Sequence, residues 1–327
     1  MPPERVVLAP FTDAHVHLGL VPLAELRAGG IARVVDLGWS PTAAAGWAGL
    51  TGVAVAGGLL GPPGGYPSRA GWAPADAAVP VADADSGREA VVATAALGAR
   101  VVKVTLNADA GPVWGDDVLR AVVDHAHAEG LPVAAHVQGV GQAERAADAG
   151  VDVFAHTPWS ERLDDGLVAR LAGTTTWIST LDIHGHGRRT PAFRTAQDNL
   201  ARFAAAGGDV RYGTDLGNGP LPRGLNAREL RALADAGLRG ETLVAALTTG
   251  TQSRWNPFAG MPDGLVSVVA GPMPTSSRAA DTVRWLGTAR TETAARTETD
   301  ARTETATRTE TAARTEHTDT PADRSPR

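Results

Sequence analysis

Apolar and β-branched residues occur in short runs along the first 250 positions, and alanine-rich stretches separate these runs. A short apolar run bounded by turn residues is typical of a buried strand, whereas the longer stretches have helical lengths and several end at glycine. Eight runs are predicted to be strands: 6–15, 31–36, 53–59, 100–106, 132–137, 152–156, 175–181 and 209–215. Helices are predicted at 86–98, 116–129, 142–149, 161–171 and 191–206.

Eight alternations of strand and helix predict an α/β fold, a (β/α)8 TIM-like barrel. A doubly wound open sheet is the competing fold, but the number of repeats favours the barrel. Catalytic side chains of such barrels stand at the C-terminal ends of the strands, where the βα loops begin. Candidate chemistry is therefore expected at those ends.

Composition changes after the predicted barrel. From Arg290 onward Arg-Thr-Glu recurs with a fixed spacing, and the tract has almost no apolar residue larger than alanine. Such a segment cannot bury enough surface to offset chain entropy, which predicts disorder, although a marginal salt-bridged helix is an alternative. We expect a barrel over 1–256, a short extension over 257–286 and a disordered repeat tail over 287–327.

Overall composition narrows the class of protein. The 327 residues are 43% hydrophobic, carry a net charge of −6 and include no cysteine. A globular protein without disulfides or thiol chemistry is expected. The absence of a basic stripe argues against nucleic acid, and no apolar stretch approaches the roughly 20 residues needed to cross a membrane. With no signal-peptide pattern at the start, we expect a cytoplasmic protein that acts on a small-molecule substrate, with homo-oligomerisation left open.

One lysine stands out, because Lys103 is the only lysine among the 30 lysines and arginines. It lies in the predicted buried strand 100–106, where an unpaired charge is costly. A guanidinium keeps its proton in proteins, whereas a buried lysine can become a neutral nucleophile. The position therefore indicates that the amine itself is needed. The alternative is a compositional accident, with the head group reaching the surface.

Histidines occupy several predicted strand ends. His15 and His17 are two residues apart on the first strand, so both side chains face the same way and could share one cation. His136 ends the fifth strand, His156 the sixth, and Asp215 the eighth. His-x-His also occurs at 125–127, but on a predicted helix, where residues two apart diverge.

At this point the chain resembles the amidohydrolase superfamily of metal-dependent hydrolases, over residues 8–256 and most visibly in Asp13-Ala14-His15-Val16-His17-Leu18. The resemblance implies a binuclear type in which His15 and His17 bind the more buried metal, His136 and His156 bind the more exposed one, Asp215 binds metal and moves protons, and Lys103, carboxylated by CO2, bridges both. Two departures are visible. The family's β-sandwich is expected to be reduced or absent, with 264–269 as its remnant, and Tyr66 stands in a loop where some relatives carry histidine.

The resemblance implies hydrolysis of an amide, cyclic amide or related ester bond by a metal-bridging hydroxide, with Asp215 as the catalytic proton acceptor. Zn²⁺ suits imidazole and carboxylate ligands best, and Mn²⁺, Fe²⁺ or Ni²⁺ fits the same geometry. Substrate contacts are expected from the βα loops, at Tyr66, Trp114, Trp159 and His184. For both tryptophans the alternative is a packing role, and for His184 it is a surface position.

Two other functions compete. A mononuclear zinc deaminase of the same superfamily would use His15, His17, a third histidine and Asp215, but no glutamate lies near His136, within 133–140, to shuttle protons, and Lys103 would have no task. A non-catalytic metal-binding or interaction protein on a decayed barrel is the other. The complete set of ligand-type residues argues against it.

Overall fold

The computed structural model describes residues 4–248, 254–261, 263–275 and 278–295. Seven parallel strands form one sheet in the order β11-β10-β9-β8-β7-β5-β6. Their bounds are β5 (Leu59–Gly61), β6 (Ala78–Pro80), β7 (Val102–Asn107), β8 (Val133–Gln138), β9 (Val153–Phe154), β10 (Thr176–Ile178) and β11 (Asp209–Arg211). A second parallel sheet contains β2 (Thr12–Val16), β3 (Arg33–Asp36) and β4 (Val53–Val55).

Backbone hydrogen bonds join the two parallel sheets at both edges of the smaller one. Ala14 donates to the carbonyl of Tyr212 (3.0 Å), and Val16 forms a parallel bridge with Leu216, so β2 lies beside the segment that follows β11. Arg100 donates to the carbonyl of Val55 (2.9 Å), which places β4 beside the start of β7. The parallel strands are thereby connected in a mixed α/β fold.

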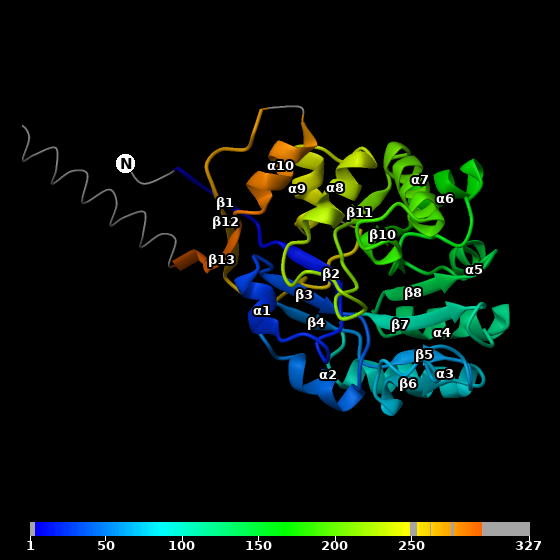
Figure 1. Ribbon diagram of the computed structural model, residues 1–327. Helices are drawn as coiled ribbons and strands as arrows, with labels where there is room; N and C mark the ends of the chain where they lie inside the picture. The colour runs from blue at the N-terminus through cyan, green and yellow to red at the C-terminus, as the bar shows by residue number, and fades with distance from the viewer. Residues whose placement is uncertain (1–3, 249–253, 262, 276–277, 296–327) are drawn as a thin grey trace, which may run out of the picture.

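Helices cover the outside of these strands (Figure 1). They are α1 (Leu23–Ala28), α2 (Pro41–Trp47), α3 (Ala84–Ala96), α4 (Asp116–Ala128), α5 (Gln142–Asp148), α6 (Asp165–Thr174), α7 (Pro191–Ala205), α8 (Ala227–Asp235), α9 (Glu241–Leu247) and α10 (Ala279–Leu286), with 3-10 turns at η1 (Ala75–Ala77) and η2 (Asp182–His184). Polar caps set several starts: Asp83 accepts a hydrogen bond from the Ser86 amide at α3, and Thr190 accepts one from Phe193 at α7. None of the described helices combines the length and apolar character that crossing a bilayer requires.

Two predicted strands are each divided in the structure. The run 6–15 forms β1 (Arg5–Leu8) and β2, which join different sheets, because Pro10 between them has no amide hydrogen for a ladder. The run 53–59 forms β4 and β5, with the chain turning at Gly57, whose φ is 79°. A left-handed backbone of this kind suits glycine.

A small antiparallel sheet, ordered β1-β12-β13, lies to one side of the parallel strands (Figure 1). Strand β12 (Leu265–Ala270), in the segment predicted to be a sandwich remnant, pairs with β1. The predicted start of the disordered tail is wrong, because Arg290–Thr293 forms β13 and pairs with β12. The two central residues of this strand, Thr291 and Glu292, are half-buried, and the Glu292 carboxylate lies 3.8 Å from the Arg5 guanidinium. The later repeats, from residue 296 on, lie outside the described residues.

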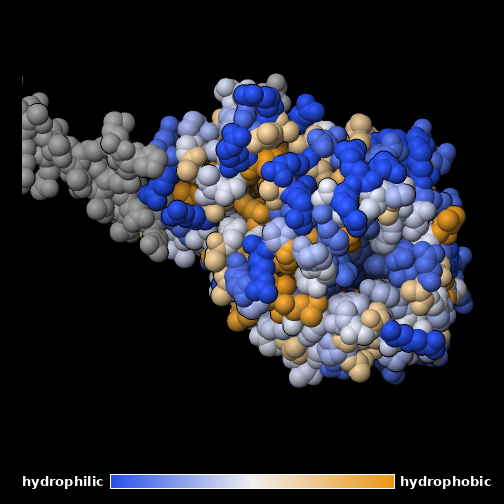
Figure 2. Space-filling model, in the orientation of Figure 1, coloured by the Kyte–Doolittle hydropathy of each residue, from blue (hydrophilic) through white to orange (hydrophobic). Residues whose placement is uncertain are grey.

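Polar side chains interrupt the core of the parallel strands. All residues of β2 and β7 are buried, including Asp13, His15, Lys103 and Thr105. By contrast, Figure 2 shows an outer face that is mainly hydrophilic, with small and separate hydrophobic areas. Buried polar groups need partners or a function. Their concentration inside the parallel strands marks the place of the candidate site.

Candidate metal centre

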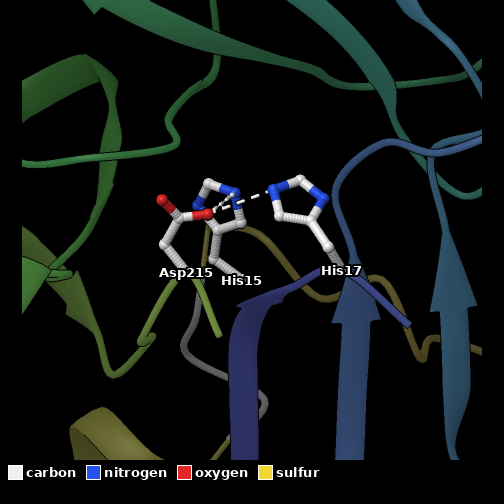
Figure 3. A group of neighbouring side chains, drawn as sticks. All are labelled: His15, His17 and Asp215. Carbon is white, nitrogen blue, oxygen red and sulfur yellow. Dashed lines mark ion pairs between the residues drawn. The ribbon is translucent and has the colours of Figure 1, made fainter. Parts of the chain in front are cut away.

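Three predicted ligands converge in the structure. His15 and His17 on β2 and Asp215 after β11 offer ligand atoms that all lie within 4.8 Å of one another. Asp215 Oδ1 lies 3.3 Å from His15 Nε2 and 3.1 Å from His17 Nε2. Figure 3 shows both imidazole rings facing this one carboxylate oxygen. Two imidazoles and a carboxylate in this arrangement match the donor set of a divalent transition metal.

The outer nitrogens of both histidines are fixed by the backbone. His15 Nδ1 donates to the carbonyl of Ala155 and His17 Nδ1 donates to that of Gly38, each at 2.8 Å. Because a carbonyl only accepts, Nδ1 carries the proton and Nε2 keeps its lone pair. This second layer of contacts orients metal-binding histidines in general.

Asp13 couples the two segments that supply this group. Its carboxylate accepts hydrogen bonds from the His15 amide (3.1 Å), the Thr214 amide (3.0 Å) and the Thr214 hydroxyl (2.6 Å). Burial raises the pKa of Asp13 to about 7, against the effect of these hydrogen bonds. The side chain therefore holds His15 and Asp215 in fixed relation.

His136 and His156 lie next to this group, from β8 and from the end of β9. The ring centroid of His156 lies 4.6 Å from that of His15 and 4.9 Å from that of His136. His156 Nδ1 is 2.9 Å from the Thr180 hydroxyl, which leaves Nε2 for a ligand. His136 Nε2 lies 3.3 Å from Gln138 Oε1.

Lys103 is buried on β7 at 1% exposure, and its Nζ has no hydrogen-bond partner. It lines the same cavity as the four histidines. Burial lowers the pKa of Lys103 to about 7, while the carboxylates of Asp215 and Asp36 act in the opposite direction. An unpaired buried amine among metal-type ligands is the least satisfied group of the site.

The protonation states suit cation binding. Burial lowers the pKa of His136 to about 3 and lowers those of His15 and His156 well below 6.5. For Asp215, burial acts to raise the pKa, but the imidazoles of His15 and His17 hold it well below its usual range. Metals bind neutral imidazole and ionised carboxylate.

Backbone strain gathers at the same place. The non-glycine residues with positive φ among those the structure describes are Thr180 (41°), His186 (49°) and Asp215 (54°). A β-branched residue such as Thr180 rarely adopts this region. The amides of Thr180 and Asp215 donate to Gly213 and His15, respectively, which holds the strained segments. Strain of this kind is typical of functional sites.

A cavity of about 280 Å³ opens over the ligands. Tyr66, Trp159 and His184, which the sequence predicted to contact substrate, line it, together with Trp72, His186 and Asn218. Trp114 does not. It is 4% exposed and its indole nitrogen donates to the Val81 carbonyl (2.7 Å), so the predicted substrate contact is wrong and the packing alternative describes this residue.

A larger cavity, of about 680 Å³, lies where α7, α8 and α9 end. Alanines and glycines form much of its wall, and the guanidinium of Arg211 is bonded to backbone carbonyls of Ala245 and Thr248. It contains no convergent group of ligand-type side chains among the described residues. Convergent chemistry, and not size, therefore selects the smaller cavity.

The residues fit a metal centre. Three of the buried polar atoms without a hydrogen bond are His15 Nε2, Asp215 Oδ1 and Lys103 Nζ, and all three belong to this cluster. Leaving buried polar atoms unpaired is costly, whereas a cation would satisfy the two former atoms. A positive ammonium beside a cation is unfavourable, so Lys103 fits only as a neutral or modified amine.

Comparisons with known proteins concern the sequence and the fold. No protein-family model matches the chain. The uncharacterized protein Rv2915c of Mycobacterium tuberculosis (strain ATCC 25618 / H37Rv) is 31% identical over 170 residues, which are 47% of this chain and 45% of that protein. The chain thus matches less than half the length of this relative.

Solved structures are similar over most of the chain. A Xaa-Pro dipeptidase with methionine bound in its active site has a TM-score of 0.65 and 17% identity, covering 88% of this chain and 87% of that one. Ochratoxinase of A. niger has a TM-score of 0.58 and 17% identity, covering 81% and 77%. The chain shares the fold of these two proteins.

Proposed function

We propose that the protein is a metal-dependent hydrolase that cleaves an amide, cyclic amide or related ester bond of a small molecule. The convergence of His15, His17 and Asp215 beside a second histidine pair carries this proposal. The shared fold supports it, and so do the hydrogen bonds at both edges of the β2-β3-β4 sheet, which favour a closed (β/α)8 barrel.

Two sets of residues would hold two divalent ions, for which Zn²⁺ is the best match. His15, His17 and Asp215 form the first set, and His136 with His156 forms the second. When bound, such ions lower the pKa of water toward about 7 and polarise a carbonyl oxygen.

Lys103 would complete the second set. Its neutral Nζ attacks CO2, an N–C bond forms, one proton leaves, and the carbamate gains a negative charge. Two carbamate oxygens can serve two ions, which explains a lysine where arginine could not act. The buried and unpaired state of Nζ supports this role.

Asp215 would move the proton of the reaction. Its Oδ1 faces the two histidines, and its Oδ2 accepts a hydrogen bond from Asn218 Nδ2 at 3.0 Å. A carboxylate fixed at both oxygens can accept a proton from the attacking water and pass it to the leaving nitrogen or oxygen. Among the described residues that line the cavity, it is the sole carboxylate.

A mononuclear deaminase is the second candidate, favoured by one observation: His15, His17 and Asp215 form a complete group by themselves. In that reaction a further carboxylate would shuttle protons near His136. Gln138 stands there instead, and its amide contacts Asn107 and Asp109. The hydrolase is therefore the better supported of the two.

Turnover by purified protein loaded with Zn²⁺ and bicarbonate tests the proposal. The panel should include N-acyl amides, dipeptides, cyclic imides, lactones and aminopurines, with chelated protein as the control. We expect release of acid from an amide or ester, lost on chelation. Ammonia release from an aminopurine alone would support the deaminase, and no turnover by metal-loaded protein would contradict both.

A further inference from the structure

Aromatic side chains from two loops stand directly beside the metal-type ligands and line the cavity. Tyr66 and Trp72, from the loop after β5, lie against different histidines: the Tyr66 ring stacks on His136 at 4.9 Å, and Trp72 is 4.7 Å from His17. Trp159, from the loop after β9, is 5.6 Å from His136. The space next to the reacting bond is thus bordered by flat rings.

These rings are held in place by their surroundings. The Thr105 hydroxyl donates to the backbone carbonyl of Tyr66 (2.7 Å), and Trp72 packs against Trp39 at 6.0 Å. Trp159 lies 4.6 Å from His184. A slot whose walls are already ordered loses little freedom when a flat group enters.

Positive charge is scarce in the same cavity. Among its described lining residues, Lys103 is the sole lysine or arginine, and it lies at the buried floor. The amides of Gln138 and Asn218 already contact other side chains, Asp109 and Asp215 respectively. Away from the proposed metal ions, a substrate carboxylate would find no lysine or arginine partner among the described lining residues, although a buried anion needs one.

Among the described lining residues, the buried neutral ring nitrogens without a hydrogen-bond partner that stay available to a substrate are Trp72 Nε1 and His184 Nε2. His184 Nε2 is buried without a hydrogen-bond partner, beside the Trp159 ring. Burial lowers the pKa of His184 to about 4, so this imidazole is uncharged near neutrality. It can exchange one hydrogen bond with an uncharged carbonyl, amide or hydroxyl group.

From these contacts we propose that the substrate is an uncharged aryl amide or aryl ester, whose ring enters the slot between Trp159 and the Tyr66–Trp72 side, and that free-carboxylate substrates such as dipeptides are excluded. The inference rests on the proposed hydrolase function for its reacting bond. The ring is recognised by stacking, and His184 contacts a neutral polar substituent.

Binding of ketones, in which CH2 replaces the nitrogen of the proposed scissile amide, tests recognition with that bond removed. One pair differs in charge alone: 4-(2-oxopropyl)benzamide and 4-(2-oxopropyl)benzoate. A second pair differs in flatness: phenylacetone and cyclohexylacetone. Calorimetry on Zn²⁺- and bicarbonate-loaded protein should show at least tenfold tighter binding of the benzamide, and tighter binding of the phenyl compound.

Variants separate the slot from the metal centre. Trp159→Leu should abolish the preference for the phenyl over the cyclohexyl compound with an unchanged metal count. Trp47→Leu, the same change at a half-buried residue outside the cavity, should leave the preference intact. Equal or tighter binding of the benzoate, or a preference that survives Trp159→Leu, would overturn the inference.

Failure of the proposed function gives a different result. Protein that binds no metal contradicts the hydrolase, while the ring preference stays measurable in the metal-free cavity. Protein that loads metal but fails the two ligand comparisons contradicts the substrate class alone.

Discussion

The two histidine pairs of the site differ in how complete they are. His15 and His17 share a carboxylate oxygen of Asp215, and the backbone fixes both outer nitrogens. His136 and His156 lie beside them, but among the described residues no carboxylate or further histidine completes a group around this second pair. In the proposed function Lys103, whose unpaired Nζ lines the same cavity, supplies the missing ligand. On that proposal one half of the site is prepared by folding, and the other half depends on a covalent change of Lys103.

Removing the carboxylate charge of Asp215, in the group with His15 and His17, should have the largest effect on activity. Asp215→Asn deprives one ion of its carboxylate and the reaction of its proton acceptor, so kcat/KM should fall by at least about 10³-fold. Asp148→Asn, on an exposed carboxylate paired with Arg170, is the matched control. The measurement is the steady-state rate on the best substrate found in the turnover test above. A loss below tenfold would contradict the role of Asp215.

Changing Lys103 should affect the incomplete half selectively. Lys103→Ala should reduce tightly bound Zn²⁺ from two ions to one per chain, because the anionic bridge is lost while His15, His17 and Asp215 remain. Elemental analysis after gel filtration measures the count. Acetate or propionate, which can supply a carboxylate in the vacated space, should restore part of the activity. Two tight ions without added acid would refute the bridge.

Removing a hydrogen bond that orients a single histidine should weaken the binding of one ion only, with a smaller effect than loss of Lys103. Thr180→Val removes the hydroxyl beside His156 Nδ1 and keeps a β-branched residue at the strained position, so affinity for one ion should fall by about 10- to 100-fold. Thr157→Val, at a buried threonine whose hydroxyl contacts the Ile178 carbonyl, is the control. Competition with a chelating dye gives both affinities, and equal weakening of both ions would contradict the division.

The pH dependence of the free energy of unfolding is the smallest of the expected effects. Burial raises the pKa of Glu229 to about 7, and its carboxylate accepts from the amides of Leu181 and Asp182 behind the His184 loop. The folded state therefore keeps a proton that the unfolded state loses from pH 4.5 upward. This group's contribution is full below pH 4.5 and is lost as pH rises through 7, by at most about 3 kcal/mol.

Urea unfolding of chelated protein at pH 5 and pH 8 measures that contribution. Glu229→Gln should reduce the difference between the two free energies of unfolding. The pKa of Asp13 is also raised by burial, so Asp13 still contributes to the pH dependence of stability in this variant. An unchanged difference would show that Glu229 is ionised throughout.

The sequence predicted most of the α/β alternation because buried parallel strands are continuous apolar runs. It missed the breaks at Pro10 and Gly57, although proline and glycine are themselves local signals of a break. It also missed the antiparallel pairing of β13, since strand pairing between distant segments has no local signal. A threonine-rich repeat reads as solvated, yet Arg290–Thr293 gains a partner in β12. Pairing with the edge strand β12 therefore makes Arg290–Thr293 a strand despite its polar composition.

The inner site was predictable to a greater degree than the cavity wall. Residues two apart on one strand must share a face, which places His15 and His17 together without further knowledge. Loop side chains follow no such rule, so Trp114 was misplaced and Trp72 was missed. A tryptophan within the glycine- and proline-rich loop 62–74 was the available signal. Asp13 and Thr180 act by positioning other residues. The sequence therefore carried no signal of their roles apart from the position of Asp13 two residues before His15.

The state of Lys103 tests the central claim most directly. Protein loaded with Zn²⁺ and ¹³C-bicarbonate should give a carbamate carbon resonance in the NMR spectrum of the wild type, and Lys103→Arg should lack it. Two bound ions without that resonance would contradict a centre bridged by carboxylated Lys103.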